Sequence, residues 1–233
     1  MLVDIFSSFD DHNQTFMSMY SLVWMLSLFV VLLFNTSFWV SNPRWMEIIF
    51  LFKETITSQV FRSFGVNLGS FMGMVSSLFL LLIFMNLVGI IPYVFSPTSH
   101  LVVSFSLGFP LWLSLIISGA MFSPSHMIAG LLPMGAPAPL NPFLVLIETV
   151  SIMVRPITLS VRLMANMSAG HIVLLLIGNY MTASMFMSSS SMFILLMIQV
   201  FYTIFEFAIC VIQAYIFCLL ITLYSDEHPH LST

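Results

Sequence analysis

Charged residues are almost absent from the long apolar part of this chain. From Val66 to Tyr224 only four residues carry a charge: Glu148, Arg155, Arg162 and Glu206. A charge at the centre of a lipid bilayer costs at least about 2.5–3.5 kcal/mol on insertion scales, and residues that persist there usually have a function. Each of the four is therefore a candidate for handling an ion, most simply a proton.

The spacing of these residues places several of them on one helix face. At about 100° per residue, Arg155 lies about 20° from Arg162 around the helix, and Glu148 and Asn166 lie about 40° from it. Two hydroxyl residues fall within the same band: Ser151 and Thr158. The pattern predicts a polar stripe along an otherwise apolar helix.

A second polar stripe follows on the last apolar segment. Gln199, Glu206 and Gln213 are seven residues apart and share a helix face. If the two segments form an antiparallel hairpin that closes near Met185, Arg162 comes roughly level with the stretch from Glu206 to Gln213. The sequence therefore predicts two polar stripes that face each other inside the membrane.

His171 and the arginines each admit a structural reading as well. His171 lies nine residues past Arg162, on the opposite side of the helix, and could be a packed residue or a proton relay. Arg155 or Arg162 could form a buried ion pair with Glu148 that holds helices in register. Small residues beside Arg162 favour close approach by another helix instead: Ala165, Ser168, Ala169 and Gly170.

Composition decides where such residues operate. The chain has 233 residues, of which 60% are hydrophobic and only 6% charged, and its mean hydropathy is +1.09. Soluble domains carry about 25% charged residues, so this chain cannot be an ordinary soluble protein. The net charge of −4 is small and no basic patch occurs, so we expect no nucleic-acid partner. We expect no metal and no cofactor.

Apolar runs of about 20 residues, long enough to cross roughly 30 Å of hydrocarbon, predict an all-α integral membrane protein. We expect a single membrane domain over residues 1–233 with about five transmembrane helices. They are Met17–Phe34, Val66–Ile91, Leu101–Phe122, Pro142–Gly178 and Met192–Tyr224. The corresponding parts of the domain are 1–40 with the first span, 66–122 with two spans, and 142–224 with the last two.

Two connecting segments have a different character. Residues 43–64 mix charges with large apolar residues, which is typical of an amphipathic helix on the membrane surface, although a solvated connector is an alternative. Its apolar positions are Trp45, Ile48, Phe52, Ile56 and Phe61. Four prolines between 123 and 141 predict a loop.

The last two helices are too long for an upright crossing. As helices they measure about 55 Å and about 50 Å. Spanning roughly 30 Å would require tilts of roughly 55°, beyond the usual range. Pro156 could kink the first helix. We favour a strongly tilted hairpin, because a groove against a large partner would stabilise that posture.

The basic residues predict the orientation. Arg44, Lys53 and Arg62 all lie in the connection after the first span, so that side is the cytoplasm-like or matrix side. The acidic N-terminus then faces outward, and after five spans the C-terminus lies on the matrix side. The N-terminal segment has three Asp and no Lys or Arg, unlike a secretory signal or transit peptide.

The run ETVSIMVRPITLSVRLMANMSAGHIVLLLIG, from Glu148 to Gly178, strongly resembles the signature of the subunit a family of the F-type ATP synthase in its mitochondrial form. The similarity extends to MNLVGIIPYVFSPTSHL, LLPMGAPAPL and FEFAICVIQAYIFCLLITLY. It covers about the last two thirds of the chain, whereas the first 60 residues match only in general character.

The resemblance implies a membrane stator subunit in which a flat helical hairpin packs against a rotating ring of subunit c. The family's essential arginine falls on Arg162 and its neighbouring amide on Asn166. The polar pair of the outer half-channel falls on His171 and Glu206, and bacterial members carry these two residue types exchanged. The order found here is the mitochondrial one.

The remaining correspondences concern the matrix half-channel. Glu148 matches its acidic residue, and Gln213 matches the glutamine that faces the arginine. Arg155 falls at a position that the family fills variably, so no role is transferred to it. The resemblance further implies peripheral-stalk and other membrane subunits as partners, the mitochondrial inner membrane as location, and proton translocation without catalysis by this chain alone.

Two other classes fit the composition. A secondary transporter would have two related halves with broken helices in corresponding positions, and no such symmetry is visible. A membrane subunit of a respiratory complex that binds two haems would need paired histidines within spans, and the predicted spans offer only His171. A purely structural subunit remains an alternative.

Overall fold

The chain forms a bundle of long helices in a computed structural model. The structure describes residues 9, 25, 44–91, 95–132, 140–186 and 188–227. The predicted first span, Met17–Phe34, lies outside these ranges except for Met25. Within the described residues the secondary structure is entirely helical, which confirms the all-α fold class.

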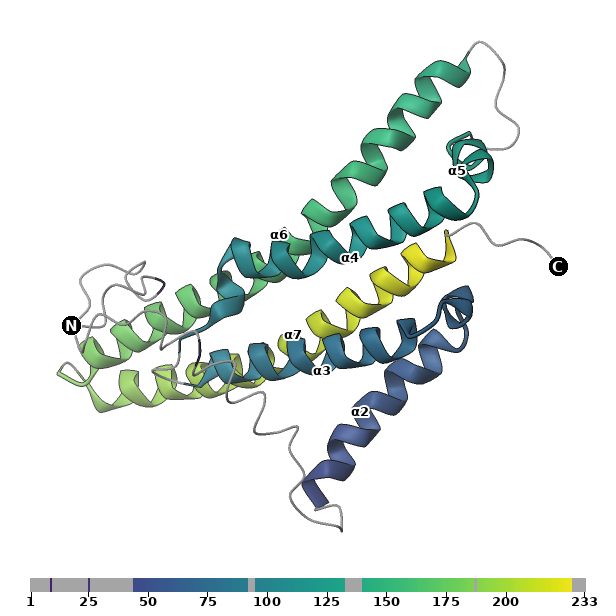
Figure 1. Cartoon of the computed structure of the whole chain (residues 1–233). Coiled ribbons are helices and arrows are strands. Elements are labelled where there is room, and N and C mark those ends of the chain that lie inside the picture. The colour runs from purple at the N-terminus through teal and green to yellow at the C-terminus, as the bar shows by residue number, and fades with distance from the viewer. Residues whose placement is uncertain are drawn as a thin grey trace.

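Figure 1 shows the helices labelled in their order along the chain. The α-helices are α2 (Arg44–Val60), α3 (Phe71–Ile90), α4 (Leu101–Phe122), α5 (Pro124–Gly130), α6 (Asn141–Ser184) and α7 (Ser189–Asp226). Two short 3-10 helices, η3 (Phe64–Asn67) and η4 (Pro97–Ser99), precede α3 and α4. Among the described residues, α3, α4, α6 and α7 are long and apolar enough to cross a membrane, and they correspond to four of the five predicted spans.

Two sequence-based boundaries need correction. The segment 123–141 was predicted to be a loop, but it begins with the short helix α5, whose first turn carries Pro124. A proline lacks only an N–H that is unpaired in a first turn anyway, so it starts this helix instead of breaking it. The span predicted from Val66 begins later, at Phe71, because η3 and a turn at Ser70, with a left-handed φ of 65°, come first.

The predicted hairpin is present as two long helices. Helix α6 has 44 residues and α7 has 38, or roughly 66 Å and 57 Å. They are joined by a short turn after Ser184, close to the predicted closure at Met185. Figure 1 shows them side by side near the turn and diverging toward the N-terminal part of α6. Both exceed the thickness of a bilayer, so strong tilt remains the prediction for them.

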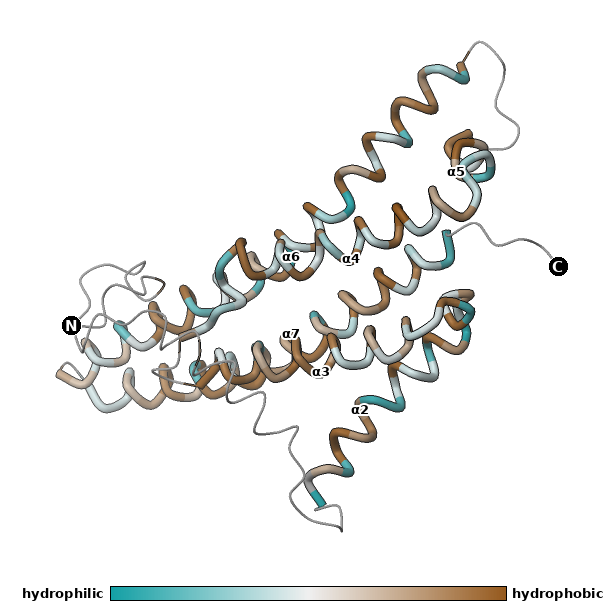
Figure 2. The backbone as a smooth tube through the Cα atoms, viewed as in Figure 1, coloured by the Kyte–Doolittle hydropathy of each residue, from teal (hydrophilic) through white to brown (hydrophobic). Residues whose placement is uncertain are grey.

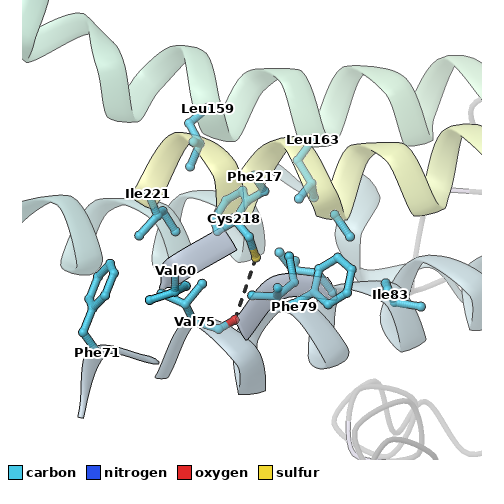
Figure 3. Packing of buried hydrophobic residues seen from close by; sticks show 13 residues of the cluster. Val60, Phe71, Val75, Phe79, Ile83, Leu159, Leu163, Phe217, Cys218 and Ile221 are labelled. Carbon is cyan, nitrogen blue, oxygen red and sulfur yellow. Dashed lines mark hydrogen bonds between the residues drawn. The ribbon is translucent and has the colours of Figure 1, made fainter. Parts of the chain in front are cut away.

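The hydrophobic core lies between α3 and α7, with contributions from α2 and α6 (Figure 3). Phe79 of α3 and Phe217 of α7 are 2% exposed, and Leu163 of α6 is fully buried against this cluster. Cys218 Sγ donates to the backbone oxygen of Val75 at 3.8 Å. The core therefore fixes the position of α7, which carries Glu206 and Gln213.

Helix α2 covers one end of this core. Ile56 and Val60 are buried in the cluster, whereas Ile48 and Phe61 are exposed. Gln59 donates a hydrogen bond to the hydroxyl of Tyr215 on α7. Figure 2 shows hydrophilic residues on α2 and at the C-terminal end of α7, and mostly hydrophobic ones along α3. A helix is thus present within the predicted range 43–64, but it ends at Val60, and its position on a membrane surface stays a prediction.

Candidate functional site

Glu206 is a buried carboxylate on the inner side of α7. Glu206 is only 3% exposed, and neither of its carboxylate oxygens has a hydrogen-bond partner among the described residues. Burial of an ionised carboxylate without partners is strongly unfavourable. Such a group is suited to bind and release a proton or to hold ordered water.

Gly170 of α6 provides the space for this carboxylate. A Cβ atom added to Gly170 would lie 2.9 Å from Glu206 Cδ and would collide with the oxygen Oε1. The sequence indicated Gly170 only as one of several small residues that permit close helix approach. The structure shows its specific contact: α6 passes directly over the Glu206 side chain.

Asn166 and Gln213 join the two predicted polar stripes. Asn166 Nδ2 donates to Gln213 Oε1 at 2.7 Å, and Gln213 is only 4% exposed. The contact links α6 to α7 one turn beyond the place where Gly170 meets Glu206. It fixes the register of the hairpin at this level.

Arg162 is exposed on α6 and makes no hydrogen bond or ion pair with any described residue. It lies one turn before Asn166, and the pairing of Asn166 with Gln213 places it level with the turn of α7 that follows Gln213. This is one turn past the predicted stretch from Glu206 to Gln213. Ala165 and Ala169 continue its exposed face. Its guanidinium is therefore available to a group from outside the described chain.

Arg155, in contrast, is held by the chain's own acids. Its Nη2 lies 3.6 Å from Glu148 Oε1, its Nη1 forms an ion pair with Glu227, and its guanidinium carbon lies 5.4 Å from the centre of the Tyr224 ring. Of the two ion pairs considered for Glu148, the one with Arg155 is formed and the one with Arg162 is not. The two arginines on the stripe thus have different surroundings.

His171 lies on the far side of α6 from Arg162, as predicted. Its Nε2 is buried and has no hydrogen-bond partner in the described part of the chain, and its ring meets Phe9 edge-on with centroids 6.2 Å apart. It follows directly after Gly170 in the sequence. His171 and Glu206 therefore lie at the same level of the hairpin, without a direct hydrogen bond between them.

Two buried polar residues on elements that pack against the hairpin were missed by sequence reasoning. Asn86 of α3 and Thr98 of η4 are both 0% exposed, and their side-chain polar atoms have no hydrogen-bond partner among the described residues. Cys210, one turn after Glu206, contacts the backbone oxygen of Asn86 at 3.9 Å. An amide within an otherwise apolar run was the available signal for Asn86. Native proteins rarely leave such groups unpaired, so this region is suited to hold water.

The geometry defines a class of protein. The helical bundle has a buried carboxylate, buried amide and hydroxyl groups on the neighbouring elements α3 and η4, and an exposed guanidinium further along the same hairpin, all without hydrogen-bond partners among the described residues. Within the described residues no group of three His, Cys, Asp or Glu side chains could hold a metal ion. These features are those of an integral membrane protein with ionisable side chains inside its helix hairpin, a class in which such residues usually serve ion or proton pathways.

Comparison with known proteins identifies the family. The model of the family described as ATP synthase A chain matches residues 15–226. The chain is 39% identical over 232 residues to ATP synthase subunit a of Artemia franciscana, covering 97% of this chain and 100% of that protein. It is 40% identical to the subunit of Albinaria caerulea over 230 residues, covering 98% and 100%, and 38% identical to that of Drosophila melanogaster over 231 residues, covering 97% and 99%.

The chain belongs to the ATP synthase A chain family. The resemblance read from the sequence is confirmed, and it extends further toward the N-terminus than predicted, because the family match begins at residue 15. The chain is accordingly a multi-pass subunit of the proton-conducting membrane part of an ATP synthase, where it works with other subunits. Its animal relatives place it in the mitochondrial inner membrane.

Proposed function

We propose that this chain forms two offset proton half-channels against a rotating ring of carboxylate-bearing c subunits, with Arg162 separating them. The observation that carries the proposal is the contrast between two arginines on one helix face. Arg155 is paired with acids of its own chain, whereas Arg162 is exposed and unpaired among the described residues. A guanidinium held at membrane depth requires an anionic partner, and the ring carboxylate is the partner that we assign to it.

The outer half-channel supplies the proton to the ring. Protons pass His171 and Glu206, with Asn86 and Thr98 as further polar groups of the path, and protonate a ring carboxylate. A neutral carboxylic acid tolerates contact with lipid, whereas an ionised one does not. Protonation therefore allows the ring to turn that subunit into the bilayer.

Arg162 acts at the end of the ring's rotation, when the protonated carboxylate reaches it. Its guanidinium stays protonated, and its positive charge favours the ionised form of the arriving carboxylate, so the proton is released toward the matrix by way of Glu148. Asn166 and Gln213 hold the helix segment that carries Arg162. The same fixed charge opposes direct proton passage between the two half-channels. Each proton that crosses releases roughly 2.3 kcal/mol per 100 mV of membrane potential.

The experiment that tests the proposal is Arg162→Ala in the intact complex. We expect loss of ATP synthesis and of ATP-driven proton pumping at normal levels of assembled complex. Arg162→Lys should fail as well, because a compact, strongly hydrated ammonium does not replace the planar guanidinium. Normal ATP synthesis by the assembled Arg162→Ala complex would refute the assignment.

A further inference from the structure

Two carboxylates contact the guanidinium of Arg155 at the end of the hairpin where α6 and α7 diverge. Arg155 contacts Glu148 on its own helix and Glu227 at the C-terminal end of α7, and its guanidinium lies over the ring of Tyr224. The Arg155 side chain is 22% exposed, against 40% for Glu148 and 48% for Glu227. A planar guanidinium can bind two carboxylates in fixed directions, which an ammonium does less well.

The end of α7 that carries Glu227 is itself anchored. The preceding Asp226 accepts a hydrogen bond through Oδ1 from the backbone N–H of Phe64, at 2.8 Å. A Cβ added to Gly65 would lie 2.6 Å from Ser225 Oγ, so the connection between α2 and α3 packs tightly on this end of α7. The connection between α2 and α3 therefore holds the backbone next to Glu227 in place.

The backbone hydrogen bonding of α6 is interrupted next to Arg155. Pro156 follows directly, and a proline inside a helix removes one backbone hydrogen bond and favours a bend. Thr158 Oγ1 donates to the carbonyl oxygen of Arg155 at 2.9 Å. The N-terminal part of α6, which begins at Asn141 and includes Glu148, diverges from α7 in Figure 1. Its direction depends on contacts such as those of Arg155.

We propose that Arg155 is a positioning residue for proton release: it binds Glu148 and Glu227 together and so fixes the releasing carboxylate of α6 against the anchored end of α7. Without the guanidinium the two carboxylates repel each other, and the part of α6 before Pro156 is free to move. The inference rests on the proposed role of Glu148 in the matrix half-channel. It assigns a function to Arg155 and to Glu227, for which the family resemblance supplied none.

The test compares Arg155→Gln, Glu227→Gln, the double variant and Arg155→Lys in the assembled ATP synthase of inner-membrane vesicles. Proton flux is measured per assembled complex, so that a loss of assembly is counted separately. Arg44→Gln and Glu54→Gln on α2 are matched controls, because they remove the same charges from exposed positions outside the cluster. Arg162→Ala serves in the same vesicles as the test of the proposed function.

We expect Arg155→Gln to lower flux about threefold to tenfold, Glu227→Gln to act in the same direction, and the double variant to be no worse than Arg155→Gln. Arg155→Lys should recover part of the flux, and the controls should match the unmodified complex. Unchanged flux in Arg155→Gln, or effects that multiply in the double variant, would overturn the inference. Failure of Arg155→Gln to assemble, with normal flux in Glu227→Gln, would also overturn it. Loss of coupling in Arg162→Ala alongside these results leaves the proposed function standing.

Discussion

Gly170 brings α6 into close contact with the carboxylate of Glu206 on α7. Glycine has no Cβ, and any added atom at this position meets the carboxylate. The space beside Glu206 is therefore set by a single residue of α6. This makes the buried carboxylate sensitive to a change of one methyl group on the facing helix.

Gly170→Ala should impair the complex even though alanine favours a helix more than glycine does. The added methyl group must displace the Glu206 side chain, at a cost of about 1–3 kcal/mol, and we expect several-fold slower proton flux per assembled complex. Gly178→Ala on the same helix is the matched control, since a Cβ there meets nothing within 4 Å. Equal flux in the two variants would show that the contact does not matter.

The sequence alone was sufficient to predict which helix face carries the candidate residues, because helix periodicity and a motif determine this. Arg162, Asn166 and Gln213 were predicted on facing stripes, and the hydrogen bond between the last two confirms that these stripes meet. Asn86 and Glu227 were not predicted. Their roles depend on which helix packs beside them, and one sequence without a tertiary arrangement does not contain that information.

At the level of elements, the α6–α7 hairpin carries every proposed proton-handling side chain except Asn86 and Thr98. Its bounds differ modestly from those expected. Helix α6 continues six residues past the predicted end at Gly178, to Ser184, and α7 begins at Ser189 instead of Met192. The Asn, Thr and Ser residues next to the connection are typical of turns. Here packing between the paired helices extends α6 and α7 through these residues. Helix α5 was missed because seven residues are too few to show helical periodicity.

The hydrogen bond between Asn166 and Gln213 should stabilise this hairpin as a pair. Asn166→Leu leaves the buried Gln213 side chain without its donor, at an expected cost of about 1–3 kcal/mol. Replacing both residues by Leu should cost less than the sum of the two single changes. The temperature at which the membrane part of the complex dissociates would measure this. Strictly additive effects would mean that the two amides do not interact in the assembled protein.

At the scale of the whole molecule, the positive charges on α2 and on the turn after it predict the orientation in the membrane. Arg44, Lys53 and Arg62 belong to the same connecting segment, and cationic segments stay on the matrix side. The proposal therefore requires the C-terminal end of α7, with Glu227, on that side as well. Helices α3, α4, α6 and α7 are long and apolar enough for four of the predicted crossings.

A cysteine introduced at Thr233 would test this orientation. The native Cys210 and Cys218 are buried, so a membrane-impermeant thiol reagent should react mainly with the new residue. We expect labelling only when the reagent reaches the matrix face. Labelling of intact mitoplasts from the outer face would reverse the assignment of the two half-channels.

The most direct measurement is the position of the Arg162 guanidinium in an experimental structure of the assembled membrane complex. We predict that it lies at mid-membrane depth within ion-pair reach, about 4 Å, of a carboxylate from a ring subunit, or one water molecule away from it. Finding Arg162 paired with an acid of its own chain, out of reach of any other subunit, would contradict the account.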